Sequence, residues 1–204
     1  MELIIATSNH GKIREFQNIL KDFPITLLTP DTLGGTLTIE EDGRTFAENA
    51  LKKARAYVEW FGRPALADDG GLEVDVLDGA PGVHSKRWLG EDTPEAHFAA
   101  AVLERMQGVP EEDRGAQMHS AIALAFPDGR YWIEEGITRG RIADLATNEV
   151  EPGLPYRQIF WIPESGKFYS ELGDDEQQQH NQRYQAMSRL TQQLASELGF
   201  RMDV

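Results

Sequence analysis

The first twenty residues contain an apolar segment, a polar loop and an amphipathic segment in succession, the pattern of a strand followed by a helix. Residues 2–6 are apolar with little alternation, as in a strand that is buried on both faces. Apolar residues then recur at helical spacing as Ile13, Phe16 and Leu20, and Ser8 or Asn9 can cap this helix. A strand that leads directly into a helix favours a mixed α/β fold.

The rest of the chain continues this alternation. Strands are predicted over 25–29, 64–67 and 158–162, and residues 116–126 and 130–142 predict a hairpin around Pro127-Asp128-Gly129. Helices are predicted from Thr45 to about Trp60, with a capping box of Thr45 and Glu48, and from Thr93 to about Met106.

The C-terminal part predicts one more helix. It carries a buried stripe of Met187, Leu190, Leu194 and Leu198. The acidic, glutamine-rich run 174–182 is either a loop or the first turns of that helix. The order of elements predicts an α/β domain with an appended hairpin lobe.

Composition narrows the class of protein. A chain of 204 residues with 40% hydrophobic residues suits one large domain or two closely joined lobes. No apolar run approaches 18 residues, the N-terminus has no secretory signal, and there is no cysteine, so we expect a cytoplasmic protein without membrane contact, disulfides or thiolate chemistry. A net charge of −14 disfavours a nucleic-acid groove, although local cations and a metal could still attract a small anion. The five histidines show no metal-ligand spacing.

A pair of acids, Asp68 and Asp69, follows the predicted strand 64–67 and precedes Gly70 and Gly71. We expect the strand to end here and the glycines to let the backbone fold tightly, which would present both carboxylates to a metal or a water. Magnesium prefers carboxylate oxygens together with phosphate oxygens. The alternative is an ordinary turn, because Asp and Gly are common turn residues.

Two other polar clusters precede this pair. Thr7, Ser8, Asn9 and Lys12 stand at a helix start, where backbone amides and a lysine can bind phosphate; the alternative is a helix cap beside a surface lysine.

The second cluster comprises Glu40 and Glu41, with Asn49 and Lys53 on the following helix. Glu41 could be a magnesium ligand or part of a solvated loop, and Lys53 could contact phosphate, pair with an acid or lie on the surface. Together the three clusters indicate metal-assisted cleavage of a phosphoanhydride. The chain has no Walker A sequence.

Four ordered motifs over residues 1–90 resemble the inosine/xanthosine triphosphate pyrophosphatase family. They are Thr7-Ser8-Asn9-x-x-Lys12-x-x-Glu15, Glu41-Asp42-Gly43-x-Thr45-Phe46-x-Glu48-Asn49-Ala50-x-x-Lys53-Ala54, Ala67-Asp68-Asp69-x-Gly71-Leu72-x-Val74-Asp75 and Gly79-x-Pro81-Gly82-x-x-Ser85-x-Arg87. The resemblance implies Mg²⁺-dependent hydrolysis of non-canonical purine nucleoside triphosphates to the monophosphate and pyrophosphate. It also implies an elongated mixed β-sheet flanked by helices, two lobes with the site in a central cleft, and a homodimer.

The resemblance also implies roles for individual residues. Asp69 takes the place of the catalytic base and metal ligand, and Glu41 that of the second metal acid, with Glu40 as the neighbouring possibility. The triphosphate contacts implied are Thr7, Ser8, Asn9 and Lys12. Asp68, Asn49 and Lys53 correspond to groups that support the carboxylates or the phosphates.

The second half departs from the family pattern. The usual Gly-Phe-Gly-Tyr-Asp-Pro aligns with Gly153-Leu154-Pro155-Tyr156-Arg157-Gln158. Leu154 therefore replaces the aromatic residue that stacks on the base, and Arg157 reverses the charge of an acid. A serine becomes Gly70, a lysine becomes Gln177, and Ser-His-Arg becomes Asn181-Gln182-Arg183.

We therefore expect an altered base preference, with substrate contacts at Gly70, Leu154, Tyr156, Arg157, Gln177, Gln182 and Arg183. The alternatives are a hydrolase of a different nucleotide and a homologue that binds nucleotide or a partner without turnover.

Overall fold

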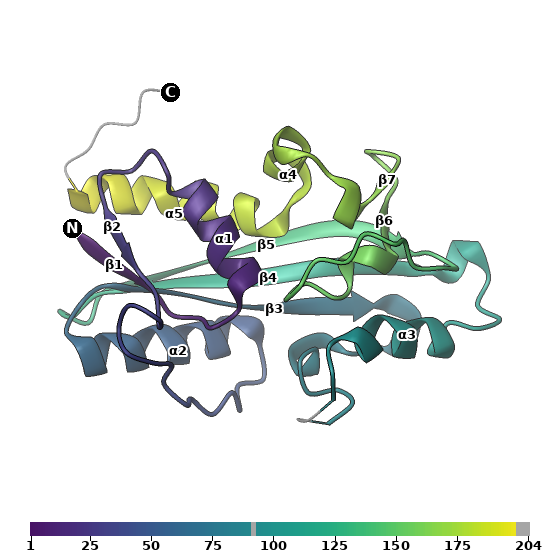
Figure 1. Ribbon diagram of the computed structural model, residues 1–204, viewed down its shortest axis with the longest axis horizontal. Helices are drawn as coiled ribbons and strands as arrows, with labels where there is room; N and C mark the ends of the chain where they lie inside the picture. Colours follow the sequence, from purple (N-terminus) through teal and green to yellow (C-terminus); the bar gives the residue numbers. More distant parts are fainter. Residues whose placement is uncertain (91–92, 199–204) are drawn as a thin grey trace. The chain divides into compact units, whose positions relative to one another are not determined.

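The computed structural model describes residues 1–90 and 93–198 (Figure 1). Seven strands form one sheet in the order β2-β1-β3-β4-β5-β6-β7. The strands are β1 (Glu2–Ile5), β2 (Thr26–Leu28), β3 (Ala65–Val74), β4 (Gly115–Ala125), β5 (Tyr131–Ile142), β6 (Phe160–Ile162) and β7 (Lys167–Phe168). The helices are α1 (His10–Ile19), α2 (Phe46–Phe61), α3 (Ala96–Arg105), α4 (Asp174–His180) and α5 (Gln182–Leu198).

The sheet is mixed, which confirms the predicted α/β class. β1 pairs in parallel with β2 and β3, whereas β6 pairs antiparallel with β5 and β7. The predicted hairpin is confirmed as β4 and β5, closed by a hydrogen bond from the Phe126 amide to the Arg130 carbonyl. It lies within the sheet order instead of forming an appended lobe.

The chain divides into two compact units. The first comprises residues 1–69, 120–136 and those from 183 onward; the second comprises 70–119 and 137–182. Three strands, β3, β4 and β5, contribute residues to both units. No helix within 1–90 or 93–198 is long and apolar enough to cross a membrane.

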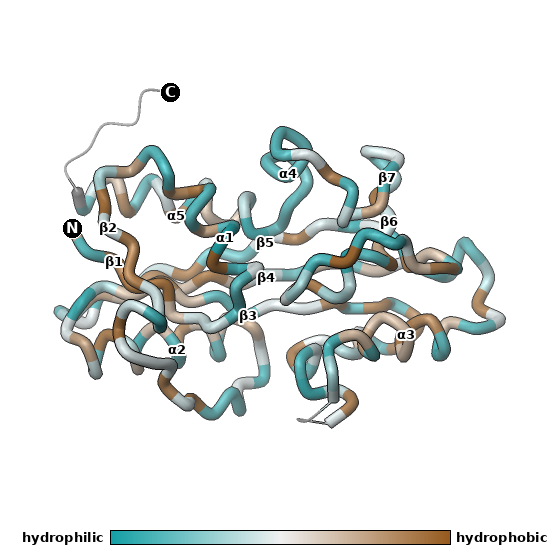
Figure 2. Tube along the Cα trace, in the orientation of Figure 1, coloured by the Kyte–Doolittle hydropathy of each residue, from teal (hydrophilic) through white to brown (hydrophobic). Residues whose placement is uncertain are grey.

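In the first unit, α2 lies on one side of the strands, and α1 and α5 lie on the other (Figure 1). The core between the strands and α1 and α5 includes Leu3, Ile5, Phe16, Leu66 and Leu190. Figure 2 shows β1 as one of the most hydrophobic segments of the unit. Met187 and Leu194 are buried as predicted, whereas the side chain of Leu198 falls outside the described part of the chain.

The second unit has its own core. Leu72, Val74 and Met118 pack there with α3 and with aromatic residues of the segment 156–172. The alternate residues of β3 and β4 carry polar groups instead, and Glu73 accepts a hydrogen bond of 2.6 Å from Gln117. One apolar and one polar face is the usual pattern of an antiparallel sheet.

The predicted strand end at Asp68 is wrong. β3 continues through both acids and both glycines to Val74. Gly71 serves a close approach and not a turn: a Cβ atom there would lie 2.0 Å from the Ser85 Oγ atom and 2.8 Å from the Gly82 carbonyl oxygen. Gly71 resembles a turn residue in the sequence, but it is needed because the segment that contains Gly82 and Ser85 approaches the strand closely.

Three boundaries also differ from the prediction. Residues 174–180 form the separate helix α4, and the chain is extended at Asn181 before α5 begins. Residues 157–159 form a 3₁₀ turn, so β6 begins only at Phe160. Helix α3 begins at Ala96, two residues after Pro94, because its first turn has i→i+3 bonds from His97 and Phe98.

Candidate active site

Asp68 and Asp69 are neighbours in β3, so their side chains leave opposite faces of the sheet. Asp69 shares its face with Ala65 and Ala67 and contacts α2. Asp68 shares its face with Leu66 and contacts α1 and α5. The two acids that look like one pair in the sequence therefore belong to two different clusters, both within the first unit.

Asp69 is held by two side chains of α2. The Asn49 Nδ2 atom donates to the Asp69 Oδ2 atom at 3.1 Å, and the Lys53 Nζ atom donates to Oδ1 at 3.0 Å. Asn49 and Lys53 are one helical turn apart and so lie on the same face of α2. Burial raises the pKa of Asp69 above its usual value, against the opposing effect of the Lys53 and Lys12 charges.

Lys53 also connects Asp69 to Glu41. Its Nζ atom lies 3.0 Å from the Glu41 Oε1 atom, so the two carboxylate oxygens that it contacts are at most about 6 Å apart. Burial alone would lower the pKa of Lys53, but the charges of Asp69, Glu41 and Asp68 raise it, so Lys53 is an ammonium ion. Glu41 is half-buried, whereas Glu40 is exposed.

The carboxylates of Glu41 and Asp69 suit a Mg²⁺ ion. No group of three or more His, Asp or Glu side chains that could enclose a metal occurs among residues 1–90 and 93–198. Mg²⁺ does not need such a group, because it is usually bound by one or two carboxylates, several waters and the phosphates of a substrate. Glu41 and Asp69, which both bind the Lys53 ammonium, can supply the two carboxylates.

The cap of α2 supports this arrangement. Thr45 accepts from the Glu48 amide at 3.1 Å, as predicted, but the Glu48 carboxylate accepts from the Arg44 amide at 2.6 Å, one residue before the cap. The helix is thereby fixed at the point where the loop that carries Glu41 enters it.

Asp68 is the centre of a buried ionic cluster. The Lys12 Nζ atom lies 2.5 Å from Asp68 Oδ1, and Arg183 donates to both Asp68 oxygens at 3.1 and 3.2 Å. Arg183 also binds Glu15 and donates to Ser120. Burial alone would raise the pKa of Asp68, but the charges of Arg183 and Lys12 hold it well below its usual range.

This cluster bears on two predicted substrate contacts, Lys12 and Arg183. Only 2% of the Arg183 side chain and 14% of the Lys12 side chain are exposed. Both cations are bound to Asp68, so any interaction with a phosphate would have to share them with that acid.

The loop before α1 also has a structural task. Asn9, not Ser8, is the N-cap: its Oδ1 atom accepts from the amides of Gly11 and Lys12 at 2.9 and 3.2 Å. The Thr7 hydroxyl accepts from the Asn9 amide at 3.2 Å, and Ser8 is exposed. The start of α1 and its first lysine are thus fixed by Asn9.

The second-half residues lie in the second unit, apart from Arg183. Arg157 is nearly buried, pairs with Glu151 at 2.8 Å and lies 4.3 Å above the Tyr169 ring. The Tyr169 hydroxyl donates in turn to the Gln182 Oε1 atom at 2.5 Å. Arg157 and Gln182, which were predicted separately, are therefore joined through Tyr169.

The other second-half residues have local partners. The Tyr156 hydroxyl donates to the Ser85 carbonyl at 2.8 Å, and burial raises the pKa of Tyr156. Gln177 accepts from the Asn181 side chain at 2.9 Å, and Leu154 is half-buried. Gly70 lies in β3, directly after Asp69.

The sequence reasoning missed several members of these clusters, chiefly Glu15, Ser120, Glu151 and Gly43. A role for Glu15 could have been predicted, because it stands one turn after Lys12 and belongs to the same family motif. The indication for Glu151 was weaker. The charge reversal at Arg157 calls for an acid nearby if that position is buried, and Glu151 is six residues away.

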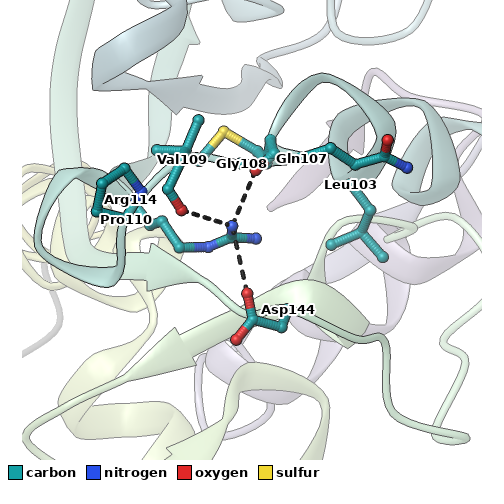
Figure 3. Close-up of a pocket in the computed structure, with 8 residues that line it drawn as sticks. Leu103, Gln107, Gly108, Val109, Pro110, Arg114 and Asp144 are labelled. Atoms are coloured by element: carbon teal, nitrogen blue, oxygen red, sulfur yellow. Dashed lines mark hydrogen bonds and ion pairs between the residues drawn. The ribbon is translucent and has the colours of Figure 1, made fainter.

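A separate pocket of about 380 Å³ lies in the second unit (Figure 3). It is lined by Leu103, Met106, Gln107, Gly108, Val109, Pro110, Arg114 and Asp144. Arg114 donates to the carbonyls of Met106 and Val109 at 3.0 and 3.3 Å and pairs with Asp144 at 3.3 Å. Arg114 thus stabilises the turn after α3, and none of the predicted site residues lines this pocket.

Comparison with known proteins places the chain in a family. The model of the Ham1 family matches residues 3–193. A protein from Desulforamulus reducens named dITP/XTP pyrophosphatase is 39% identical over 189 residues, which cover 93% of each chain. A protein of the same name from Geobacter sulfurreducens is 42% identical over 170 residues, covering 83% of this chain and 84% of its own.

Solved structures agree. A HAM1 protein from Coxiella burnetii has a TM-score of 0.83 at 34% identity and covers 96% of this chain and 99% of its own. The Staphylococcus aureus Ham1 protein has a TM-score of 0.82 at 31% identity, with 97% and 100% covered. With the family match, the relatives and the fold in agreement, this chain belongs to the Ham1 family.

Proposed function

We propose that this protein hydrolyses non-canonical purine nucleoside triphosphates, such as dITP and XTP, to the monophosphate and pyrophosphate, and that Glu41 and Asp69 hold the Mg²⁺ ion it requires. Its place in the Ham1 family, beside relatives named dITP/XTP pyrophosphatase, makes it a nucleoside triphosphate pyrophosphatase. The observation that supports the metal site is the Lys53 ammonium bound at 3.0 Å to both carboxylates.

Residues of the first unit have different roles in the proposed hydrolysis. Asp69 accepts the proton of the attacking water, and the burial that raises its pKa makes it a stronger base than an exposed carboxylate. Bound Mg²⁺ would neutralise charge on the phosphate oxygens. Lys12 and Lys53 add positive charge beside Asp68 and Asp69, and the N-terminal end of the α1 dipole favours an anion.

Base selection is where this protein should differ from its relatives. Leu154 offers no aromatic surface for the base, and Arg157 is held by Glu151 and Tyr169. Arg157 therefore shapes the subsite by supporting Tyr169 and Gln182 as well as by its charge. We expect weaker discrimination between inosine or xanthosine and the canonical bases. The homodimer implied by the family resemblance and the cytoplasmic location expected from composition stay predictions.

The test is a panel of triphosphates: dITP, ITP, XTP, ATP, GTP, CTP and UTP, each with Mg²⁺ and with chelator. Monophosphate and pyrophosphate are quantified separately. The proposal expects equal amounts of both products, only with Mg²⁺, and highest kcat/KM for a purine of the inosine or xanthosine class. Tight binding of nucleotides without products would instead identify a binding protein, and release of single phosphates would identify a different hydrolase.

A further inference from the structure

The buried side chain of Asn49 forms hydrogen bonds through both its amide nitrogen and its amide oxygen. Its side chain is fully buried, its Nδ2 atom donates to Asp69 Oδ2 at 3.1 Å, and its Oδ1 atom accepts from the Gly43 amide at 2.8 Å. Asp69 is one proposed magnesium ligand, and Gly43 is two residues from the other, Glu41. Asn49 thus connects the two backbone segments that carry the metal acids.

The contact with Gly43 leaves no room for a side chain. A Cβ atom on Gly43 would lie 2.5 Å from the Asn49 Oδ1 atom and 3.0 Å from its Cγ atom. Any residue with a Cβ must therefore displace either the loop or the amide. The next contact, at 3.0 Å, is with the Cβ atom of the exposed Glu48.

The loop has further ties to α2, but they differ in kind. Asp42 pairs with Lys52 on the surface, and the Leu37 amide donates to the Tyr57 hydroxyl at 3.3 Å. Among the contacts described here between this loop and α2, only those of Asn49 and of the Lys53 ammonium also reach Asp69. A metal ion would displace the Lys53 tie from both carboxylates, whereas the amide of Asn49 can stay in place.

We propose that Asn49 is a positioning residue that assembles the magnesium site, orienting the Asp69 carboxylate and holding the Glu41 loop against it. The proposal rests on the proposed function, because it takes Glu41 and Asp69 as the metal ligands. The bond to Oδ2 leaves Oδ1 directed at the Lys53 ammonium that Glu41 also binds. The amide is suited to this task because it offers a donor to the carboxylate and an acceptor to the backbone N–H.

The expected effect is on metal affinity. Loss of a group that orients a metal ligand typically weakens metal binding about 10- to 100-fold. Asn49→Ala removes both ties, and Gly43→Ala pushes the amide away while leaving it present. In the Asn49→Ala background the contacts with the Asn49 amide are gone and only the 3.0 Å contact with the Glu48 Cβ atom is left, so Gly43→Ala should have little further effect on Mg²⁺ affinity there.

The experiment is calorimetric titration of Mg²⁺ alone into the full-length protein. Four forms are compared: wild type, Asn49→Ala, Gly43→Ala and the double variant. Ala54→Gly serves as the stability control, because it replaces a buried residue of the same helix by a poor helix former. Asn18→Ala serves as the surface control, since Asn18 is an exposed asparagine of α1.

We expect Mg²⁺ affinity to fall at least tenfold in Asn49→Ala and severalfold in Gly43→Ala, with the double variant equal to Asn49→Ala. Ala54→Gly should lower Tm without changing Mg²⁺ affinity. The inference is overturned if Asn49→Ala binds Mg²⁺ within twofold of wild type, if Gly43→Ala has the same effect in both backgrounds, or if Ala54→Gly weakens Mg²⁺ binding as much as Asn49→Ala. A wild type that neither binds Mg²⁺ nor cleaves any triphosphate would instead overturn the proposed function.

Discussion

The Nζ atom of Lys53 lies 3.0 Å from the Oδ1 atom of Asp69, and the same ammonium group is bound by Glu41. Lys53 therefore occupies the position of a counter-ion between the two carboxylates that we assign to the metal. A magnesium ion must compete with it, so Lys53 should act on metal binding and on catalysis in opposite directions.

We predict that Lys53→Met binds Mg²⁺ alone more tightly, by roughly tenfold or about 1.4 kcal/mol, and hydrolyses triphosphates more slowly. Tighter binding follows from removal of the competing cation, and slower hydrolysis from loss of a positive charge beside the phosphates. Titration calorimetry and kcat/KM measure the two effects. Weaker Mg²⁺ binding by the variant would show that Lys53 organises the carboxylates instead of competing for them.

Asp69→Asn should abolish Mg²⁺-dependent hydrolysis and keep the fold. The variant retains an oxygen that can accept from Asn49 but loses the base and a charged ligand, which costs at least about 100-fold in rate. Single-turnover kinetics and circular dichroism test the two parts. A folded variant with turnover near that of wild type would contradict the assignment of Asp69.

Asp68→Asn should act on stability instead. Lys12 would lose its acid, whereas Arg183 would still pair with Glu15, and breaking a buried ion pair in this way costs about 3–5 kcal/mol. Urea denaturation of the Asp68→Asn and Asp69→Asn variants compares the neighbours directly. Equal free energies of unfolding for the two variants would refute the division into two clusters.

Lys12→Ala should weaken binding of a non-hydrolysable triphosphate by about tenfold. It should also destabilise the protein less than Asp68→Asn does, since Arg183 still compensates Asp68. The exposed Lys21, on the turn after α1, provides the control variant Lys21→Ala. If both lysine variants bind the triphosphate as wild type does, Lys12 serves only Asp68.

Leu154→Phe should restore part of the purine preference. An aromatic ring that stacks on the base contributes roughly 1–3 kcal/mol in nucleic-acid binders, so kcat/KM for ITP and XTP should rise about tenfold relative to CTP and UTP. Leu145→Phe, at an exposed leucine of the same unit, is the control. No change in either variant would place the base subsite elsewhere.

The structure also shows why Arg157→Asp alone is a poor test of specificity. It would set a second acid against Glu151 in a nearly buried place. A charge-swapped pair, Arg157→Asp with Glu151→Lys, keeps the pairing.

Local signals predicted most of the fold and pointed to the carboxylates that we propose as metal ligands. The Thr45 cap and the apolar spacing after it located α2 within two residues, and the acid pair pointed to the chemistry of β3. These features depend on residues close in sequence, whose effects a single chain displays.

The failures involve distant partners. Gly71 looked like a turn residue because the reason for it, Ser85, lies fourteen positions away in another segment. Arg183 was predicted only as a substrate contact, because its partner Asp68 precedes it by 115 residues. Nothing near Arg183 in the sequence reveals that pairing.

The alternation of β3 has a consequence for how mutations elsewhere will be felt. β3 is aligned by its parallel pairing with β1, in which Ile4 is opposite Ala65 and Ile5 is opposite Leu66. A slip of one residue in this pairing would turn every side chain of β3 to the other face. A slip in one direction would place Asp69 where Asp68 meets Arg183, and a slip in the other would place Asp68 where Asp69 meets Lys53. In either case both acids would be retained and both misplaced. Substitutions in β1 that shift its register with β3 should therefore abolish hydrolysis while the helices and the sheet are still formed.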